Sequence, residues 1–403
     1  MTRRWKKRSW RKIMGVAAAC LLGLFVLCVA VLFTASGIWQ EPRYLEPWKK
    51  TYADAYPDPR LHIAAQALLA PNNHNMQPWK LKLDPDNPLV YELFADPARM
   101  TKEADPASRQ MMITVGAFLE YARIAGEQLG YASRIEFMPD GAYEENALDA
   151  SMAAKPAARV TLTKTAPADS PLYPLLFQPD TNRLPYKAQP LSDEQAKQLS
   201  QVESEAQGLH VTLVRDALQV NAISQYAQDA AAVEAANERV MAESAALFRA
   251  NERQKNKYRY GFSVEGQGTT GILKHVLQGL VTLFPGMNSG KGAEERYVKS
   301  ANESAEHTPA YALIESAAND RISQIQSGML YARWALTAES LGLAVQPMSQ
   351  VLEEYEEMAK LREKFHAEYA QHGGTIQMLI RVGVPTGEVP RSMRRDVSDL
   401  LLP

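Results

Sequence analysis

A short polar segment near residue 75 has the residue types needed to bind a planar, hydrogen-bonding ligand. Residues 70–79 read Ala-Pro-Asn-Asn-His-Asn-Met-Gln-Pro-Trp, between an apolar stretch and a strand-like one. Main-chain N–H groups and side-chain amides can donate and accept hydrogen bonds, which suits a ring whose edge alternates donors and acceptors, as a flavin does. An Asx-turn beside a buried tryptophan explains the same residues. The turn alone therefore leaves both interpretations open.

His74 is the one titratable group in this turn. An imidazole ionises near neutral pH, so His74 could donate a proton to a reduced substrate. It could equally be held by a hydrogen bond to nearby main chain. The two cysteines, Cys20 and Cys28, both lie in an apolar N-terminal segment. We therefore expect no metal site and no nucleophilic cysteine in the rest of the chain.

The distribution of charge argues against nucleic-acid binding. Residues 1–12 contain seven basic side chains and no acidic one, while the whole chain has a formal net charge of −2. The remaining residues are therefore acidic on balance. Binding of nucleic acid needs clustered Lys and Arg side chains against the phosphates, so nucleic acid is not an expected partner.

The apolar segment at residues 13–35 predicts one transmembrane anchor. It contains no charged residue, and about 20 helical residues span the hydrocarbon core of a bilayer. The basic tail at 1–12 predicts a cytoplasmic N-terminus, a single pass through the inner membrane, and a periplasmic domain in a Gram-negative bacterium. A cleaved signal peptide is the alternative, although its apolar region is normally about 7–15 residues. Residues 36–58 are then a linker to the domain.

Helical and strand-like segments alternate along the rest of the chain, which predicts an α+β fold. A proline-rich stretch at 167–190 separates a first half, 59–175, from a second half, 176–403. The segment from Gly116 to Gly130 parallels the segment from Gly328 to Gly342, because both are helical patterns of equal length closed by Leu-Gly. Each copy occupies the corresponding place in its half, which favours an internal duplication.

The second half contains a long connection that suggests a lid. We expect one long helix over 220–250, a largely irregular segment over 252–306 with an apolar helix near 270–283, and another helix over 351–371. A connection of this length without regular structure is uncommon inside a compact domain. The apolar side chains near 270–283 could pack over a ligand, or they could contact a bilayer.

Several segments, in order along the chain, resemble the nitroreductase superfamily, and in particular its Acg-type branch. Ala-Pro-x-x-x-Asn-x-Gln-Pro-Trp at 70–79 resembles the flavin-contacting turn of the superfamily. Residues 105–131, 181–191, 342–349 and 378–395 resemble further segments of the branch, ending in a basic tail. The matches run from about residue 60 to residue 400.

The resemblance implies an FMN flavoprotein built as a fused pseudo-dimer with a lid. Because typical nitroreductases are dimers with FMN between the subunits, a fused chain would hold one FMN between its halves and act as a monomer. The residues that match the family's cofactor contacts are Asn72, Asn73, Asn75, Gln77, Asn182, Arg183, Pro347, Met348, Arg391, Arg394 and Arg395.

The matching residues divide by role. The amides of the turn would contact the ring or the ribityl chain, and Pro347 and Met348 would lie against the ring. Arg183, Arg394 and Arg395 suit the phosphate, because a guanidinium binds its oxygens bidentately. Pro179-Asp180 stands where the family has a basic pair. The phosphate contact is therefore expected to rest more on the C-terminal arginines.

Three functions fit these features. The first is a membrane-anchored oxidoreductase that reduces a small electrophile, a nitro compound or a quinone, by hydride transfer from the flavin. Because NAD(P)H is scarce outside the cytoplasm, its electrons would come from a membrane quinol or a redox partner. The second is a protein that sequesters FMN under a closed lid. The third is a flavin-free, membrane-anchored interaction protein.

Overall fold

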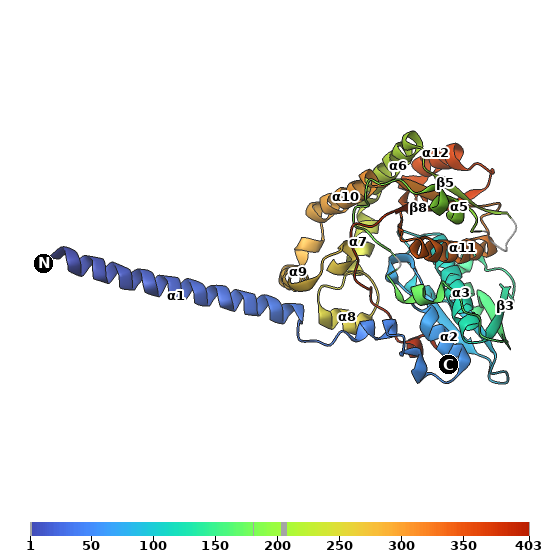
Figure 1. Cartoon of the computed structure of the whole chain (residues 1–403), viewed down its shortest axis with the longest axis horizontal. Helices are drawn as coiled ribbons and strands as arrows, with labels where there is room; N and C mark the ends of the chain where they lie inside the picture. The colour runs from blue at the N-terminus through green and yellow to red at the C-terminus, as the bar shows by residue number, and fades with distance from the viewer. Residues whose placement is uncertain (1, 180, 203–207, 403) are drawn as a thin grey trace.

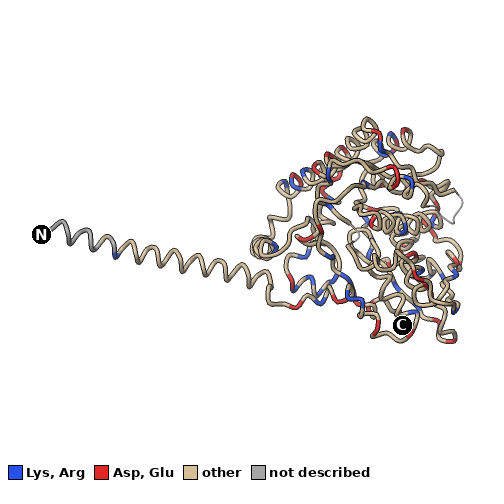
Figure 2. The backbone as a smooth tube through the Cα atoms, viewed as in Figure 1, with Lys and Arg blue, Asp and Glu red and all other residues tan. Residues whose placement is uncertain are grey.

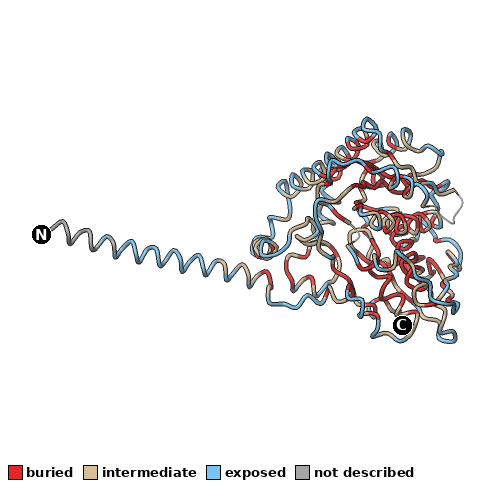
Figure 3. The backbone as a smooth tube through the Cα atoms, viewed as in Figure 1, coloured by how far each residue is buried: buried red, intermediate tan, exposed pale blue. Residues whose placement is uncertain are grey.

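The computed structural model describes residues 2–179, 181–202 and 208–402, so Asp180 of the expected phosphate region lies outside the described residues. One long helix, α1 (Thr2–Ser36), projects from a globular part (Figure 1). Its segment Lys12–Ser36 is long and apolar enough to cross a membrane, and its most apolar window is 0% buried. Figures 2 and 3 show this segment largely uncharged and exposed along most of its length. A signal sequence near an N-terminus has the same properties.

Two four-stranded sheets form the framework of the globular part, and all neighbouring strands are antiparallel. The strand orders are β1-β2-β4-β3 and β5-β6-β8-β7, so each sheet has the same order when counted from its own first strand. The strands are β1 (Trp79–Leu83), β2 (Val90–Ala95), β3 (Tyr131–Phe137), β4 (Ala158–Lys164), β5 (Leu209–Val214), β6 (Ala310–Ser316), β7 (Ala344–Pro347) and β8 (Thr375–Gly383).

Helices cover both sheets and separate them, and several begin at a side chain that accepts a main-chain N–H of the first turn, such as Asp58, Asp216 and Asp320. The first half contains α2 (Pro59–Ala67), α3 (Arg109–Gln128) and α4 (Leu148–Ala154). The second half contains α5 (Asp193–Ser200), α6 (Ala217–Ala236), α7 (Glu238–Ala246), α8 (Glu252–Tyr258), α9 (Gly271–Leu283), α10 (Lys291–Glu306), α11 (Arg321–Ser340) and α12 (Ala359–Tyr369).

Helices α3 and α11 cross at two glycines and bring the two halves together (Figure 1). A Cβ on Gly116 would lie 1.8 Å from the carbonyl oxygen of Ile325, and a Cβ on Gly328 would lie 1.8 Å from that of Ile113. Gly328 faces Ile113, which lies three residues before Gly116. Gly116 faces Ile325, which lies three residues before Gly328. The crossing is therefore the same when viewed from either helix, and only residues without a side chain permit it.

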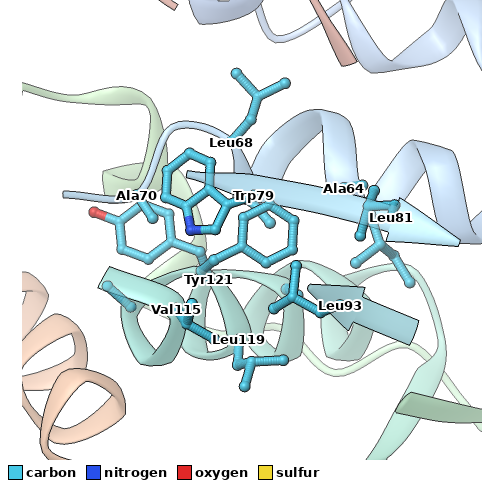
Figure 4. Packing of buried hydrophobic residues seen from close by; sticks show 14 of the residues in the cluster. Ala64, Leu68, Ala70, Trp79, Leu81, Leu93, Val115, Leu119 and Tyr121 are labelled. Carbon is cyan, nitrogen blue, oxygen red and sulfur yellow. The ribbon is translucent and has the colours of Figure 1, made fainter. Parts of the chain in front are cut away.

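The first hydrophobic core packs around Trp79 at the start of β1 (Figure 4). The indole ring is fully buried among Leu68, Val115 and Tyr121, and its Nε1 donates to the carbonyl of Thr114 at 3.2 Å. An aromatic side chain of this size contributes strongly to a core once its polar atom is hydrogen-bonded. Trp79 thus fixes the end of the polar turn to the core, as the sequence predicts.

Residues 36–58, expected to be a linker, pack on the first half. They form the 3-10 turns η1 (Arg43–Trp48) and η2 (Ala53–Ala55), with Tyr44 and Trp48 buried. The Nε1 of Trp48 donates to the carbonyl of Ser392 at 2.8 Å. Burial of Tyr44 and Trp48 holds the chain between α1 and the domain in place.

Parts of the predicted secondary structure were wrong. Residues 252–306 are mostly helical, since they contain α8, α9 and α10. The helix expected over 220–250 divides at Asn237, whose side chain accepts the N–H groups of Arg239 and Val240 and so begins a new helix. The helix expected over 351–371 begins only at Ala359, after two 3-10 turns. Strands β3 and β7 were not expected, because each directly follows a Leu-Gly helix end and lacks an apolar run.

The glycine crossing makes a direct prediction about stability. Gly116→Ala and Gly328→Ala should each lower the free energy of unfolding by about 1–3 kcal/mol, because the added methyl group meets main chain that cannot move aside. Thermal or denaturant unfolding of the detergent-purified chain measures this. Gly292→Ala in α10 is the control, since its Cβ would meet only the end of the Arg296 side chain, at 3.5 Å. Unchanged unfolding of both core variants would contradict the close crossing.

Candidate functional site

The polar turn between α2 and β1 has an unusual backbone. His74, Asn75 and Gln77 all have positive φ angles, of 50°, 51° and 50°. Residues with a side chain rarely adopt this left-handed conformation, and such strain tends to collect at functional sites. The Oδ1 of Asn72 accepts the N–H of Gln77 at 2.9 Å, and the N–H of Asn73 donates to a hydroxyl of α3 at 3.0 Å. These bonds stabilise the strained turn against the core.

Part of the expected lid lies directly on this turn. The Nδ2 of Asn75 donates to the carbonyl of Gly261 at 3.2 Å, and the N–H of Gly261 donates back to the carbonyl of Asn75 at 3.1 Å. The Nε2 of Gln77 donates to the carbonyl of Arg259 at 2.8 Å. The ring of Phe262 lies 5.3 Å from the ring of His74. In this structure the side-chain amides of Asn75 and Gln77 are therefore engaged by residues 259–262.

The C-terminal tail holds the turn from the other side, through two buried arginines. Arg394 donates to the carbonyl of Leu69 at 2.8 Å and to the Oδ1 of Asn75 at 3.0 Å. Arg395 donates from its main chain to the Oε1 of Gln77 at 2.7 Å and from its guanidinium to the carbonyl of Gln77 at 3.0 Å. Burial lowers the pKa of Arg395 to about 10, so it remains charged at neutral pH. Both guanidinium groups donate to main-chain carbonyls, and Arg394 also donates to the Asn75 side chain; their phosphate role stays a prediction.

The remaining predicted residues come from the second half and the tail. Asn182 is buried, and its N–H donates to the carbonyl of Val345 at 3.0 Å. Met348 is buried in the second half, with its N–H donating to the carbonyl of a β8 residue at 2.8 Å. Pro347 is half-buried and Arg183 and Arg391 are exposed. Arg391 donates to the carbonyl of Phe177 at 3.0 Å. Arg183 lies within electrostatic range of His74.

The pKa of His74 in the turn is affected by a charge of the second half. Burial lowers its pKa from the ordinary 6.5 to about 4, and the positive charge of Arg183 acts in the same direction. The Nδ1 atom is buried and has no hydrogen-bond partner among the described residues, although part of the ring is accessible. The imidazole is therefore neutral at pH 7, with one ring nitrogen directed at no protein group.

Comparisons with known proteins give one set of relatives by sequence. No family model matches the chain. Two sequences of Mycobacterium tuberculosis, from strains CDC 1551 and H37Rv, are each 25% identical to it over 346 residues, which is 84% of this chain and 90% of each relative. Both carry the name "Putative NAD(P)H nitroreductase". The similarity supports the nitroreductase superfamily.

Solved nitroreductases are also similar to the chain, at lower identity. A nitroreductase with bound FMN from Desulfitobacterium hafniense is 13% identical, with a TM-score of 0.36 over 57% of this chain and 96% of that one. An FMN-dependent nitroreductase from Mycobacterium smegmatis, in complex with NADPH, is 17% identical, with a TM-score of 0.32 over 54% of this chain and 91% of that one.

Two groups at the site of this nitroreductase-like chain were not expected from the sequence. Arg381 of β8 is fully buried, 3.9 Å from the ring centroid of Tyr186, and donates to the carbonyls of Asn182 and Leu184. It therefore positions the segment that presents Arg183. A single charge inside an otherwise apolar strand was the available signal. The lid residues 259–262 carried no signal, because they contact the turn mainly through main-chain atoms.

The environment of His74 predicts a pH dependence of stability. Because its pKa is about 4 in the folded chain and near 6.5 when unfolded, the unfolded chain takes up the proton first as the pH falls. The contribution of the neutral His74 ring to the free energy of unfolding is therefore fully present above pH 6.5 and is lost between about pH 6.5 and 4. His74→Gln should flatten the loss of unfolding free energy over this window, measured by denaturant titration at several pH values. The exposed His307→Gln is the control, and equal slopes for His74→Gln and the parent chain would refute the assignment.

Proposed function

We propose that the chain is an FMN-dependent oxidoreductase of the nitroreductase type, tethered to a membrane by α1. The observation that carries the proposal is the turn at 72–77. Three strained residues and a buried, unpartnered His74 Nδ1 lie there within electrostatic range of Arg183 from the other half. Strain, an unsatisfied polar atom and a nearby exposed cation are together typical of a site for a polar anionic ligand.

We further propose that the chain is a fused pseudo-dimer of the Acg type and functions as a monomer. Two features support this: the identical strand order of the two sheets and the symmetric crossing at Gly116 and Gly328. The tail adds a third, since Leu402 of the second half donates to the carbonyl of Leu81 at 2.8 Å, and Leu401 pairs with the edge of β1. The tail of the second half thus extends the first half, as one subunit of an intertwined dimer does to the other.

The residues of the turn fit FMN in type. Asn72, Asn73, Asn75 and Gln77 would hold the ring or ribityl chain through their amides, and Pro347 and Met348 would limit its other side. The bound flavin would supply the hydride chemistry. The protein's own contribution is to orient the ring, to exclude water with Phe262 and its neighbours, and to keep His74 neutral. A neutral imidazole N–H can donate a hydrogen bond to the substrate, whereas proton donation would need the imidazolium form, which the lowered pKa of His74 disfavours at neutral pH.

We assign the phosphate contact chiefly to Arg183. Arg394 and Arg395 are engaged by carbonyl oxygens, which favours a role in holding the tail to the turn. Arg183 is exposed, and Arg381 fixes the segment that carries it. This reverses the expectation that the C-terminal arginines provide most of the phosphate affinity. Asn182 serves as a support, because its side chain donates to the carbonyl of Gly387 at 2.9 Å.

The membrane anchor would determine the compartment of the domain and therefore its electron donor. With the basic residues 1–12 on the cytoplasmic side, the domain lies in the periplasm, where a membrane quinol or a redox partner would reduce the flavin. The acceptor would be a small electrophile such as a nitro compound or a quinone. The second candidate function, sequestration of FMN, is favoured by one observation: residues 259–262 close over the turn through main-chain hydrogen bonds. The third candidate function, a flavin-free interaction protein, is favoured because the Asn75 and Gln77 amides already donate to residues of the chain itself.

Arg183→Ala tests the phosphate assignment. A charge-assisted hydrogen bond contributes about 1.5–3 kcal/mol, so the variant should bind FMN about 10- to 100-fold more weakly. Its affinity for riboflavin, which lacks the phosphate, should stay unchanged. Fluorescence titration of both ligands measures the two affinities.

Lys187→Ala is the matched control, because Lys187 is an exposed cation four residues away on the same segment. It should retain the preference for FMN over riboflavin. If Arg183→Ala retains that preference as well, Arg183 is not the phosphate ligand.

A further inference from the structure

Helix α9 and the 3-10 turn η8 (Pro285–Asn288) carry a concentrated apolar surface that no described residue covers. Its side chains are large and strongly exposed, and we call this set the α9–η8 face: Ile272 (72%), Leu273 (60%), Leu283 (44%), Phe284 (59%) and Met287 (43%). Exposed apolar patches of this kind mark interaction sites on folded proteins. Because α9 belongs to the lid region, whatever contacts this helix can affect how a ligand reaches the turn.

The α9–η8 face is continuous with the apolar surface of α1. Helix α9 packs against the C-terminal end of α1, where a Cβ on Gly279 would lie 2.4 Å from the carbonyl of Leu32. Ser36 Oγ and His275 Nδ1 are 3.4 Å apart in the same contact. Figure 1 shows α9 beside the point where α1 meets the domain. The face therefore begins where the apolar segment Lys12–Ser36 ends.

The opposite side of α9 is polar and fixed, so the helix cannot rotate to bury its apolar side chains. Gln278 donates to Glu252 of α8 at 3.0 Å, and Lys274 forms an ion pair with the same carboxylate at 3.0 Å. Glu252 and Lys255 form a second ion pair, with both side chains almost completely buried. Breaking such buried pairs costs several kcal/mol. The outward orientation of the apolar side chains is therefore a stable property of the fold.

We propose that the α9–η8 face is a second membrane contact, which lies at the boundary between the headgroups and the acyl chains of the bilayer that α1 spans. The inference rests on the membrane anchoring proposed above. A helix with one polar face and one apolar face lies in the interface plane of a bilayer, and α1 holds this one at that interface. Lipid is the occupant because the face continues the surface of α1, which itself must contact lipid.

The lipid contact gives the lid a function in substrate choice. Through Tyr44, whose hydroxyl donates to Glu252 at 2.7 Å, the chain that leaves α1 is tied to α8. Helix α8 leads directly to Arg259 and Gly261, which lie on the turn. A lid seated in the bilayer would admit an apolar, membrane-dissolved electron carrier such as a quinone in preference to a water-soluble one.

Site-specific fluorescence quenching in the full chain tests this contact. In a Cys20→Ala, Cys28→Ala background, single cysteines replace Ile272 or Phe284, an environment-sensitive fluorophore is attached, and the chain is reconstituted in phosphatidylcholine nanodiscs. Lipids with a nitroxide near the headgroup should quench both positions several-fold more strongly than lipids with a deep nitroxide. Leu24→Cys in α1 reports the anchor itself and should show the reverse depth preference. Leu218→Cys, 80% exposed on α6, is the matched control and should show no quenching.

The outcomes separate this inference from the anchor. Quenching at position 24 without quenching at 272 and 284 overturns the lipid contact and leaves the anchor intact. Absence of quenching at all three positions overturns both. Energy transfer between labels on two chains, without quenching by lipid, would make the face an interface between copies, and this also overturns the proposal.

Discussion

The close crossing of α3 and α11 is the constraint on which the rest of the structure depends. Because Gly116 and Gly328 have no side chains, the two helices approach until each Cα lies against the other main chain. That approach sets the two sheets on opposite sides of one helix pair. It also brings the turn at 70–79, which is fixed to α3, close to the segment at 182–186. The proposed site, which uses residues of both halves, depends on this contact.

Three segments that are distant in sequence then converge on the turn. The tail reaches it through Arg394 and Arg395, the lid through Arg259 and Gly261, and the chain leaving α1 through Tyr44. The carbonyl of Tyr44 accepts the main-chain N–H of Arg394 at 3.0 Å. The segment that follows α1 and the turn are thus linked through two hydrogen-bonded residues, Tyr44 and Arg394. A movement of the lid would alter both the amides of the turn and the contact with α1.

Local patterns in the sequence were sufficient to predict part of the fold and of the candidate site. The Pro-bounded turn, the core position of Trp79, the two helices closed by Leu-Gly and the apolar N-terminal helix each depend on residues close together in the chain. The uses of Arg394 and Gln77 do not, because their partners lie more than 180 residues away. A guanidinium group suits a phosphate or a carbonyl oxygen equally well, and only the fold decides which it meets. Helix α9 of the lid was predicted, whereas α8 and α10 were missed because both are rich in charge and lack an apolar stripe.

The central claim is that the junction of the two halves holds one FMN. The visible absorption spectrum of the detergent-purified chain, with chromatography of the cofactor released by heat, tests this claim most directly. We expect flavin absorption bands and the release of FMN in a one-to-one ratio with the chain. A colourless protein that also takes up no added FMN would contradict the account, and would leave a nitroreductase-like fold whose turn serves only to join its two halves.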